Sequence, residues 1–206
     1  MSIIKLNNRG VKDATAIGSI TGLGNMRLIK KITASSDDTI SFVDGTSDVV
    51  LDDTYKEYLF TFKDIHPETD NVHFTFQGNA AGGSGYDETI TSTAFYYQLD
   101  EGNSDPELAY EAGSDQAQGT AFQRLGHSVG NDNDQCIVGT LHLFNPSSTT
   151  FVKHFIGTTN IYHTSDYSVG LRTGGYFNTT SAIDEIQFKM SSDAIDAGDI
   201  CLYGIL

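Results

Sequence analysis

Residues 56–77 read KEYLFTFKDIHPETDNVHFTFQ and contain two alternations of apolar and polar residues, separated by a short stretch around Pro67. The apolar members of the two alternations are Tyr58, Phe60 and Phe62, and then Val72, Phe74 and Phe76. Residues two apart in a strand point to the same face, so each segment is expected to bury one aromatic face. Because the connection is short, we expect the two strands to pair as antiparallel neighbours with these aromatics on one side of a core.

The rest of the chain repeats this pattern and shows no comparable helical periodicity. Twelve short apolar segments recur between clusters of Ser, Asp and Gly, enough for about ten strands over about 180 residues, which indicates a β-sandwich. They are Met26–Thr33, Thr39–Val43, Val49–Leu51, Tyr55–Ile65, Asn71–Gln77, Thr89–Leu99, Ala121–Leu125, Cys136–Asn145, Thr150–Gly157, Tyr167–Thr173, Ala182–Met190 and Asp199–Ile205. The prediction is an all-β protein with a single antiparallel, jelly-roll-like sandwich.

The sequence predicts two further local features, a hairpin at the C-terminal end and a long surface connection. The last two strand segments are expected to form a closing hairpin, which adds four residues to the predicted core: Ile186, Phe188, Ile200 and Leu202. The weakly patterned stretch Asp100–Gly119 is expected to cross the surface, with room for one helical turn around Glu107–Glu111.

The N-terminal 25 residues differ from the body. Apart from Ile3, Ile4 and Leu6, this segment offers little to a core, and those three residues would leave an apolar edge on a monomer. We therefore predict an arm over residues 1–25 for assembly or docking and one domain over residues 26–206; an edge strand with an ordinary loop is the alternative.

Composition and charge exclude several classes of function. The chain has 206 residues, 21 of them Gly, and its 27 acids outweigh 12 bases to give a net charge of −15. Such an excess repels nucleic acid and anionic membrane surfaces. No run reaches the roughly 18 apolar residues of a membrane helix, and Met1–Gly10 lacks the apolar region of a signal peptide. We expect no nucleic-acid partner, no membrane insertion, and synthesis in the cytoplasm.

The sequence contains no catalytic or cofactor-binding motif. It lacks a G-x-S-x-G elbow and a phosphate-binding loop, and its many acids form no recognisable pair, so we predict no enzyme and no cofactor. Cys136 and Cys201 lie far apart without metal-binding spacing and are expected to be free structural thiols.

Two sets of residues could hold a cation. Asn131–Asp134 resembles an acidic calcium loop but lacks the spacing of an EF-hand, so a polar turn is the favoured interpretation. His142 and His154 are equidistant from Ser148 and would face each other in a regular hairpin, but two imidazoles do not complete a metal shell. No metal site is predicted.

Four tyrosines are the candidate binding residues. Tyr86, Tyr97, Tyr162 and Tyr167 are expected at the surface or beside loops, where their rings could stack on sugars and their hydroxyls could form hydrogen bonds. The alternative is that each ring covers an edge of the core.

Several segments together resemble a family of virion structural proteins from tailed phages of marine bacteria, with central strands similar to β-sandwich domains of tail fibres. They are Ser2–Arg9, Tyr55–Phe62, Ile65–Asp70, Asn131–Gln135, Leu141–His154 and Ile200–Ile205. The resemblance spans almost the whole chain and is most specific in LHLFNPSSTTFVKH, residues 141–154. It implies a location in the virion, other virion proteins as partners and, as in many phage fibres, a homotrimer.

The function expected from these observations is a non-enzymatic fibre or spike component that contacts the host surface, with a host cell-surface glycan as a further partner. The alternatives are a capsid decoration protein and, in another class, a carbohydrate-active enzyme on a lectin-like sandwich. A catalytic site would require a concave pair of carboxylates with perturbed pKa values.

Overall fold

The computed structural model describes residues 25–206 and contains thirteen strands and no helix in that range. The strands are β1 (Met26–Asp37), β2 (Ile40–Val43), β3 (Glu57–Pro67), β4 (Val72–Ala80), β5 (Ile90–Asp100), β6 (Glu107–Tyr110), β7 (Gln116–Gly119), β8 (Gln123–Val129), β9 (Ile137–Phe144), β10 (Lys153–His163), β11 (Tyr167–Phe177), β12 (Ile183–Met190) and β13 (Ile195–Ile205). The predicted all-β class is confirmed. No helix in this part of the chain could cross a membrane. Ile3, Ile4 and Leu6 of the predicted arm lie outside the described residues.

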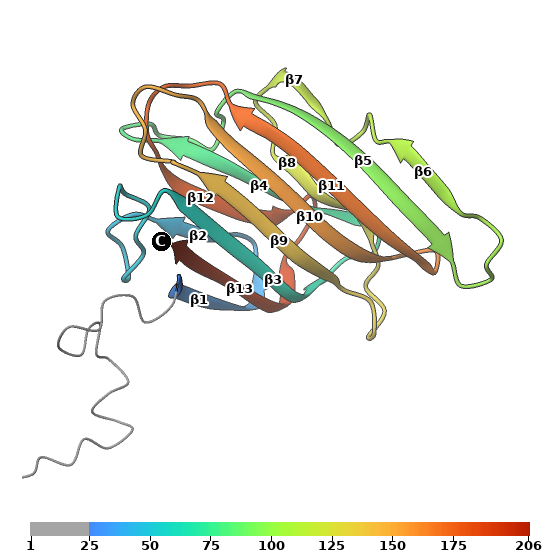
Figure 1. Ribbon diagram of the computed structural model, residues 1–206. Coiled ribbons are helices and arrows are strands. Elements are labelled where there is room, and N and C mark those ends of the chain that lie inside the picture. Colours follow the sequence, from blue (N-terminus) through green and yellow to red (C-terminus); the bar gives the residue numbers. More distant parts are fainter. Residues whose placement is uncertain (1–24) are drawn as a thin grey trace, which may run out of the picture.

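All strand pairs are antiparallel, and they form one hydrogen-bonded sheet that nearly closes into a barrel-like shape (Figure 1). The main path runs β1-β13-β3-β9-β10-β8-β4-β12-β2, and a branch leaves β10 through β11 to β5, which pairs with β6 and β7. The link from β10 to β8 is a single residue pair, His163 with Val129. The sheet is therefore continuous, and separate sandwich layers or a jelly roll are not confirmed.

The predicted core is confirmed. All ten residues expected inside are buried, and rings from the two sides of the barrel meet at Phe188, whose centroid lies 5.2 Å from that of Phe60 and 5.9 Å from that of Phe74. The alternation of apolar residues therefore identified the buried face of each strand correctly.

The predicted pairing of β3 with β4 is wrong. β3 pairs with β13 and β9, whereas β4 pairs with β12 and β8. The two aromatic faces instead meet across the interior, with the rings of Phe62 and Phe74 5.1 Å apart. In this arrangement each aromatic face covers the other, whereas two paired strands would present both faces on one side and need a third element to cover them.

The predicted closing hairpin is also wrong, for the same reason. β12 pairs with β4 and β2, and β13 pairs with β1 and β3, so the two last strands lie on opposite sides of the core. The hairpin expected around Ser148 is present, because β9 and β10 pair directly, and Asn145, which follows β9, adopts a positive φ of 48°.

The stretch between β5 and β8 contains two short strands in place of the expected surface crossing or helical turn. β6 pairs with β5 so that Tyr110 lies opposite Phe95, and β7 pairs with the other end of β5. Val49 and Leu51 are buried but belong to no strand.

Candidate functional site

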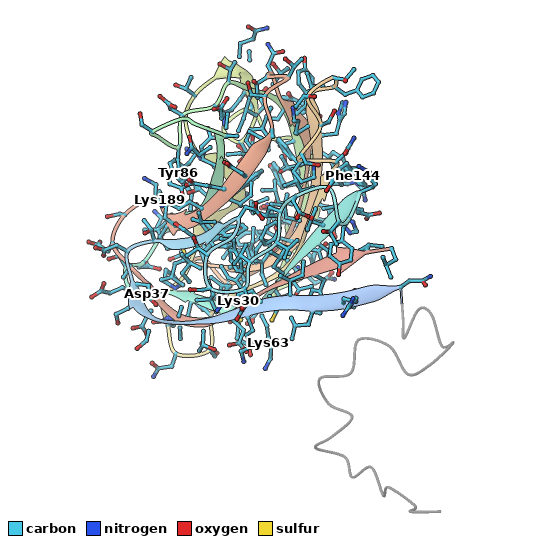
Figure 2. All side chains as sticks on the ribbon, turned by 90° about the vertical axis from the view of Figure 1, so that its left-hand side faces the viewer. Lys30, Asp37, Lys63, Tyr86, Phe144 and Lys189 are labelled. Carbon is cyan, nitrogen blue, oxygen red and sulfur yellow. The ribbon has the colours of Figure 1, made fainter. Side chains whose placement is uncertain are left out.

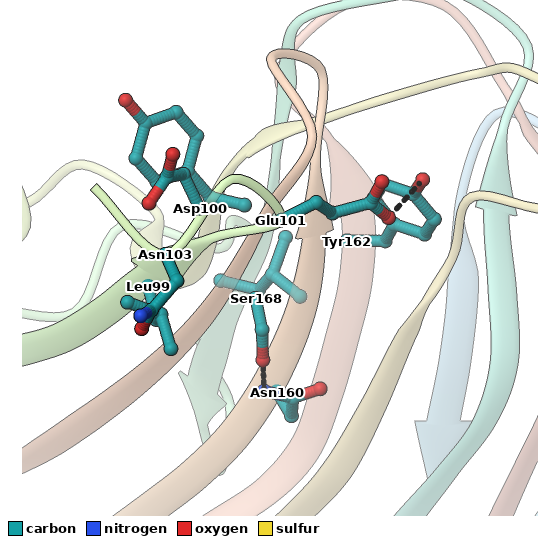
Figure 3. A pocket seen from close by; sticks show the side chains of 9 residues that line it. Leu99, Asp100, Glu101, Asn103, Asn160, Tyr162 and Ser168 are labelled. Carbon is teal, nitrogen blue, oxygen red and sulfur yellow. Dashed lines mark hydrogen bonds between the residues drawn. The ribbon is translucent and has the colours of Figure 1, made fainter. Parts of the chain in front are cut away.

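A pocket of about 430 Å³ lies on the outer face of the sheet where β5, β11 and β10 run side by side (Figure 3). The register places Leu99 of β5 opposite Ser168 of β11, and Ser168 opposite Tyr162 of β10. These side chains point away from the core because their neighbours, among them Ile161 and Val169, are fully buried. The floor of the pocket therefore comes from three adjacent strands.

The segment that follows β5 forms one wall of the pocket. Asp100 fixes its shape, because its carboxylate accepts hydrogen bonds from the backbone N–H groups of Ser104 and Asp105, at 2.6 and 2.8 Å. The Ser104 hydroxyl also donates to this carboxylate. That bond, followed by the two backbone bonds, lowers the pKa of Asp100. Asn103 adopts a positive φ of 54°, which suits a tight turn.

The second wall residue, Glu101, is tied to the strand floor. The hydroxyl of Tyr162 donates to Glu101 Oε1 at 3.0 Å, and this hydrogen bond raises the pKa of Tyr162 to about 12. On the floor, Asn160 Nδ2 donates to Ser168 Oγ at 3.1 Å. Figure 3 shows both bonds across the pocket. The side chains are thus held in place before any ligand arrives.

The structure brings two of the four candidate tyrosines into this pocket. Tyr162 lies on the floor, and Tyr167 lines the side, where its hydroxyl donates to Asp105 Oδ2 at 3.1 Å and its pKa is raised by that bond. Tyr97 does not line the pocket. It lies two residues before Leu99 on β5, and its ring lies over the backbone of Gly170. These three belong to one surface.

Tyr86 is elsewhere. It lies between β4 and β5, where burial raises the pKa of its hydroxyl, which donates to Glu185 Oε2 at 2.8 Å. Of the four tyrosines predicted from the sequence as binding residues, the fold therefore brings three onto one surface and places Tyr86 apart from them.

A strip of exposed apolar side chains continues from the pocket across β5 and β6. Its members are Phe95, Tyr97, Leu99, Leu108 and Tyr110, with exposed fractions between 41% and 72%. Contiguous apolar surface of this kind is typical of a binding face. Apart from Tyr97, these residues were not predicted from the sequence as binding residues. The available signal was the alternation in β5, where Ser92 and Ala94 are buried and Phe95, Tyr97 and Leu99 lie on the opposite face.

Within residues 25–206, no group of three or more His, Cys, Asp or Glu side chains is placed so that it could hold a metal ion. The expected facing of His142 and His154 is wrong, since His142 pairs with Ile156 and binds Glu57 at 2.6 Å. The ring of His154 instead packs against Tyr176.

The two remaining minor predictions hold. The Asp132–Asp134 segment is a polar turn closed by Gln135, whose backbone N–H donates to Asp132 O at 2.8 Å. Cys136 and Cys201 are free thiols, and burial raises the pKa of Cys136.

No family model matches the chain, and neither the curated proteins nor the solved structures contain a match. The resemblance to phage virion proteins therefore stays a prediction, and the site must be interpreted from its own chemistry.

Proposed function

We propose that this protein is a non-enzymatic, glycan-binding module, and that it serves as the host-contacting part of a phage fibre or spike. The observation that carries the proposal is the pocket on β5, β11 and β10, which combines an aromatic ring, apolar surface and fixed polar groups in one concavity. Such combinations are typical of sites that hold small polar ligands.

The chemistry of the lining favours a neutral sugar. Sugar hydroxyls are hydrogen-bond donors, and Glu101 Oε2 and Asn160 Oδ1 accept no hydrogen bond from the described residues. The carbon-bound hydrogens of a sugar face can pack on Tyr162 and Leu99. Because Asp100 and Glu101 are the charged residues of the lining within residues 25–206, the pocket disfavours anionic ligands.

The same acids support binding over catalysis. Glycoside hydrolysis requires a carboxylic acid with a raised pKa beside a second carboxylate. The pKa of Asp100 is lowered, so this group is ionised when a general acid would need its proton. Among residues 25–206, burial raises the pKa of the Asp184 carboxyl group. Asp184 does not line this pocket.

Placement in a virion, as a homotrimer with other virion proteins, is supported by the resemblance of residues 141–154 and the other segments. The aromatic faces of β3 and β4, opposed across the core, support a flattened, sandwich-like description of the barrel. A capsid decoration protein is the second candidate, because the exposed strip with Leu108 and Tyr110 could be buried by a neighbouring subunit.

The test is binding of neutral oligosaccharides, first on a glycan array and then by titration calorimetry. Tyr162→Ala and Asn160→Ala should each weaken the best ligand by about tenfold or more, since each loss removes about 1.4 kcal/mol or more. Tyr203→Ala is the matched control, because Tyr203 lies on β13, away from the pocket. The proposal fails if no neutral glycan binds, or if binding survives both pocket substitutions.

A further inference from the structure

A second pocket, of about 330 Å³, lies beside the end of β12 and shares no lining residue with the first. Its walls come from β4, from the connection between β6 and β8, and from β12. Three side chains of basic residue types line it: His73 of β4, Arg124 of β8 and Lys189 of β12.

Arg124 and Lys189 have no ion-pair partner in the described part of this acidic protein. Within residues 25–206, neither side chain donates a hydrogen bond or lies within 4.0 Å of a carboxylate, although the chain carries 27 acids. Lys189 Nζ is held 4.1 Å above the ring of Phe122. The ring of Tyr86 lies 6.4 Å from that of Phe122, and Figure 2 labels Tyr86 and Lys189 near each other.

His73 adds a neutral donor. The backbone N–H of Ser128 donates to His73 Nδ1 at 3.2 Å, so the proton of the neutral ring is on Nε2. Burial, and then the nearby Arg124, lower the pKa of His73 to about 4. The ring is therefore neutral at physiological pH and presents an N–H group.

A buried hydroxyl completes the donor set. Ser114 lines the pocket, is 2% exposed, and its Oγ has no hydrogen-bond partner in the described part of the chain. A buried polar atom without a partner is costly in a folded protein unless a ligand or water satisfies it. Ser114 thus points independently to a bound polar group.

The wall that holds Ser114 is fastened by buried amides. Gln123, fully buried, donates from Nε2 to Ser114 O at 2.6 Å. Gln77, also fully buried, donates from Nε2 to the carbonyl oxygens of Thr120 and Ala121. The pocket is a built feature of the fold.

The acids near this pocket are already engaged. Asp115, which lines it, accepts a hydrogen bond from the Tyr110 hydroxyl at 2.6 Å. Glu111 accepts one from the backbone N–H of Gly113 at 3.0 Å. The lining therefore carries two positive charges, on Arg124 and Lys189, and one negative charge, on Asp115.

We infer that the second pocket binds a tetrahedral oxyanion, as a sulfate or phosphate group. The planar guanidinium of Arg124 can contact two oxygens of such a group, Lys189 can contact a third, and His73 and Ser114 can donate to it. At about 0.15 M salt the Debye length is about 8 Å, so exposed acids that lie farther than this from the pocket are largely screened. The inference does not depend on glycan binding at the first pocket.

The experiment uses the full chain at constant ionic strength, with sodium chloride exchanged for sodium sulfate or sodium phosphate. Backbone amide shifts of residues 113–116 in ¹H–¹⁵N spectra report binding, and saturable shifts are expected with either ion. Galactose 6-sulfate and galactose are added in separate titrations. Tighter binding of the sulfated sugar than of free sulfate would assign the site to sulfated glycans, and equal binding would assign it to the free ion; both outcomes support the oxyanion site.

Arg124→Gln and Lys189→Gln should each weaken binding about tenfold or more, and either variant suffices if the other does not fold. Lys56→Gln is the matched control, since it removes one positive charge from an exposed side chain outside the pocket. The inference is overturned if chloride shifts the same amides equally, if no saturation occurs, or if Lys56→Gln weakens binding as much as the pocket variants.

Discussion

Replacing Phe188 by Ala should be among the most destabilising single substitutions in this protein. Phe188 is fully buried, and its ring lies within 6.3 Å of the rings of five other phenylalanines. They are Phe42, Phe60, Phe62, Phe74 and Phe76, from β2, β3 and β4. Losing the buried ring surface should cost about 2 kcal/mol. A residual cavity of about 80–100 Å³, at about 24 cal/mol per Å³, adds about 2 kcal/mol more.

We therefore expect the free energy of unfolding to fall by about 4–5 kcal/mol, near the upper end for a buried Phe. Urea melts followed by circular dichroism measure this change, provided that the slope with urea is the same for both proteins. Phe151→Ala is the control: its side chain is 68% exposed, and its removal should cost less than about 0.5 kcal/mol. A loss below about 2 kcal/mol for Phe188→Ala, or equal losses for both variants, would refute the assignment of Phe188 to the centre of the core.

Three further predictions concern the backbone, pH and the candidate site. Gly198→Ala should lower the melting temperature clearly, because Gly198 has a φ of +116° and a Cβ there would lie 2.5 Å from Asp64 O; an unchanged melting curve would contradict this. Stability should decrease as the pH falls from about 6.5 to 4, because the unfolded chain takes up a proton on His73 in this range while the folded protein does not. His73 is only partly buried, so it should contribute about 1–2 kcal/mol of this loss in the free energy of unfolding. In urea melts at several pH values, His73→Gln should make the free energy of unfolding depend less on pH; an unchanged pH dependence would exclude this contribution of His73. Gly170→Ala should displace the ring of Tyr97, which lies over Gly170, and so weaken glycan binding in calorimetry while circular dichroism stays the same; unaltered affinity would remove Tyr97 from the binding surface.

The buried faces of the strands could be predicted from the sequence because burial follows the two-residue period directly. Tyr58, Phe60 and Phe62 needed no knowledge of their neighbours to be assigned to the interior. Pairing is different. An apolar face can be buried whether the other strand lies beside it in the sheet or across the core. The four-residue connection from Glu68 to Asn71 permits both arrangements, so the alternation alone could not place β4 opposite β3.

The candidate site was partly accessible for a similar reason. Tyr162 and Tyr167 could be proposed because aromatic residues beside loops are unusual enough to notice. Glu101, Asn160 and Ser168 could not, since common polar residues gain meaning only when the register of β5, β11 and β10 brings them together. In the second pocket, likewise, Arg124 and Lys189 are 65 positions apart in the chain and meet only in the folded protein.

The position of β13 between β1 and β3 has a consequence for how the chain folds as it is synthesised. β1 pairs along its whole length with β13, from Met26 opposite Ile205 to Asp37 opposite Ile195. The first described strand therefore has no sheet partner until residues 195–205 have left the ribosome. Contacts this distant in sequence are slow to form, so the β1–β13 pair should form late in folding. A product that stops before Ile195 would leave β1 and one edge of β3 unpaired, and such exposed edges favour aggregation.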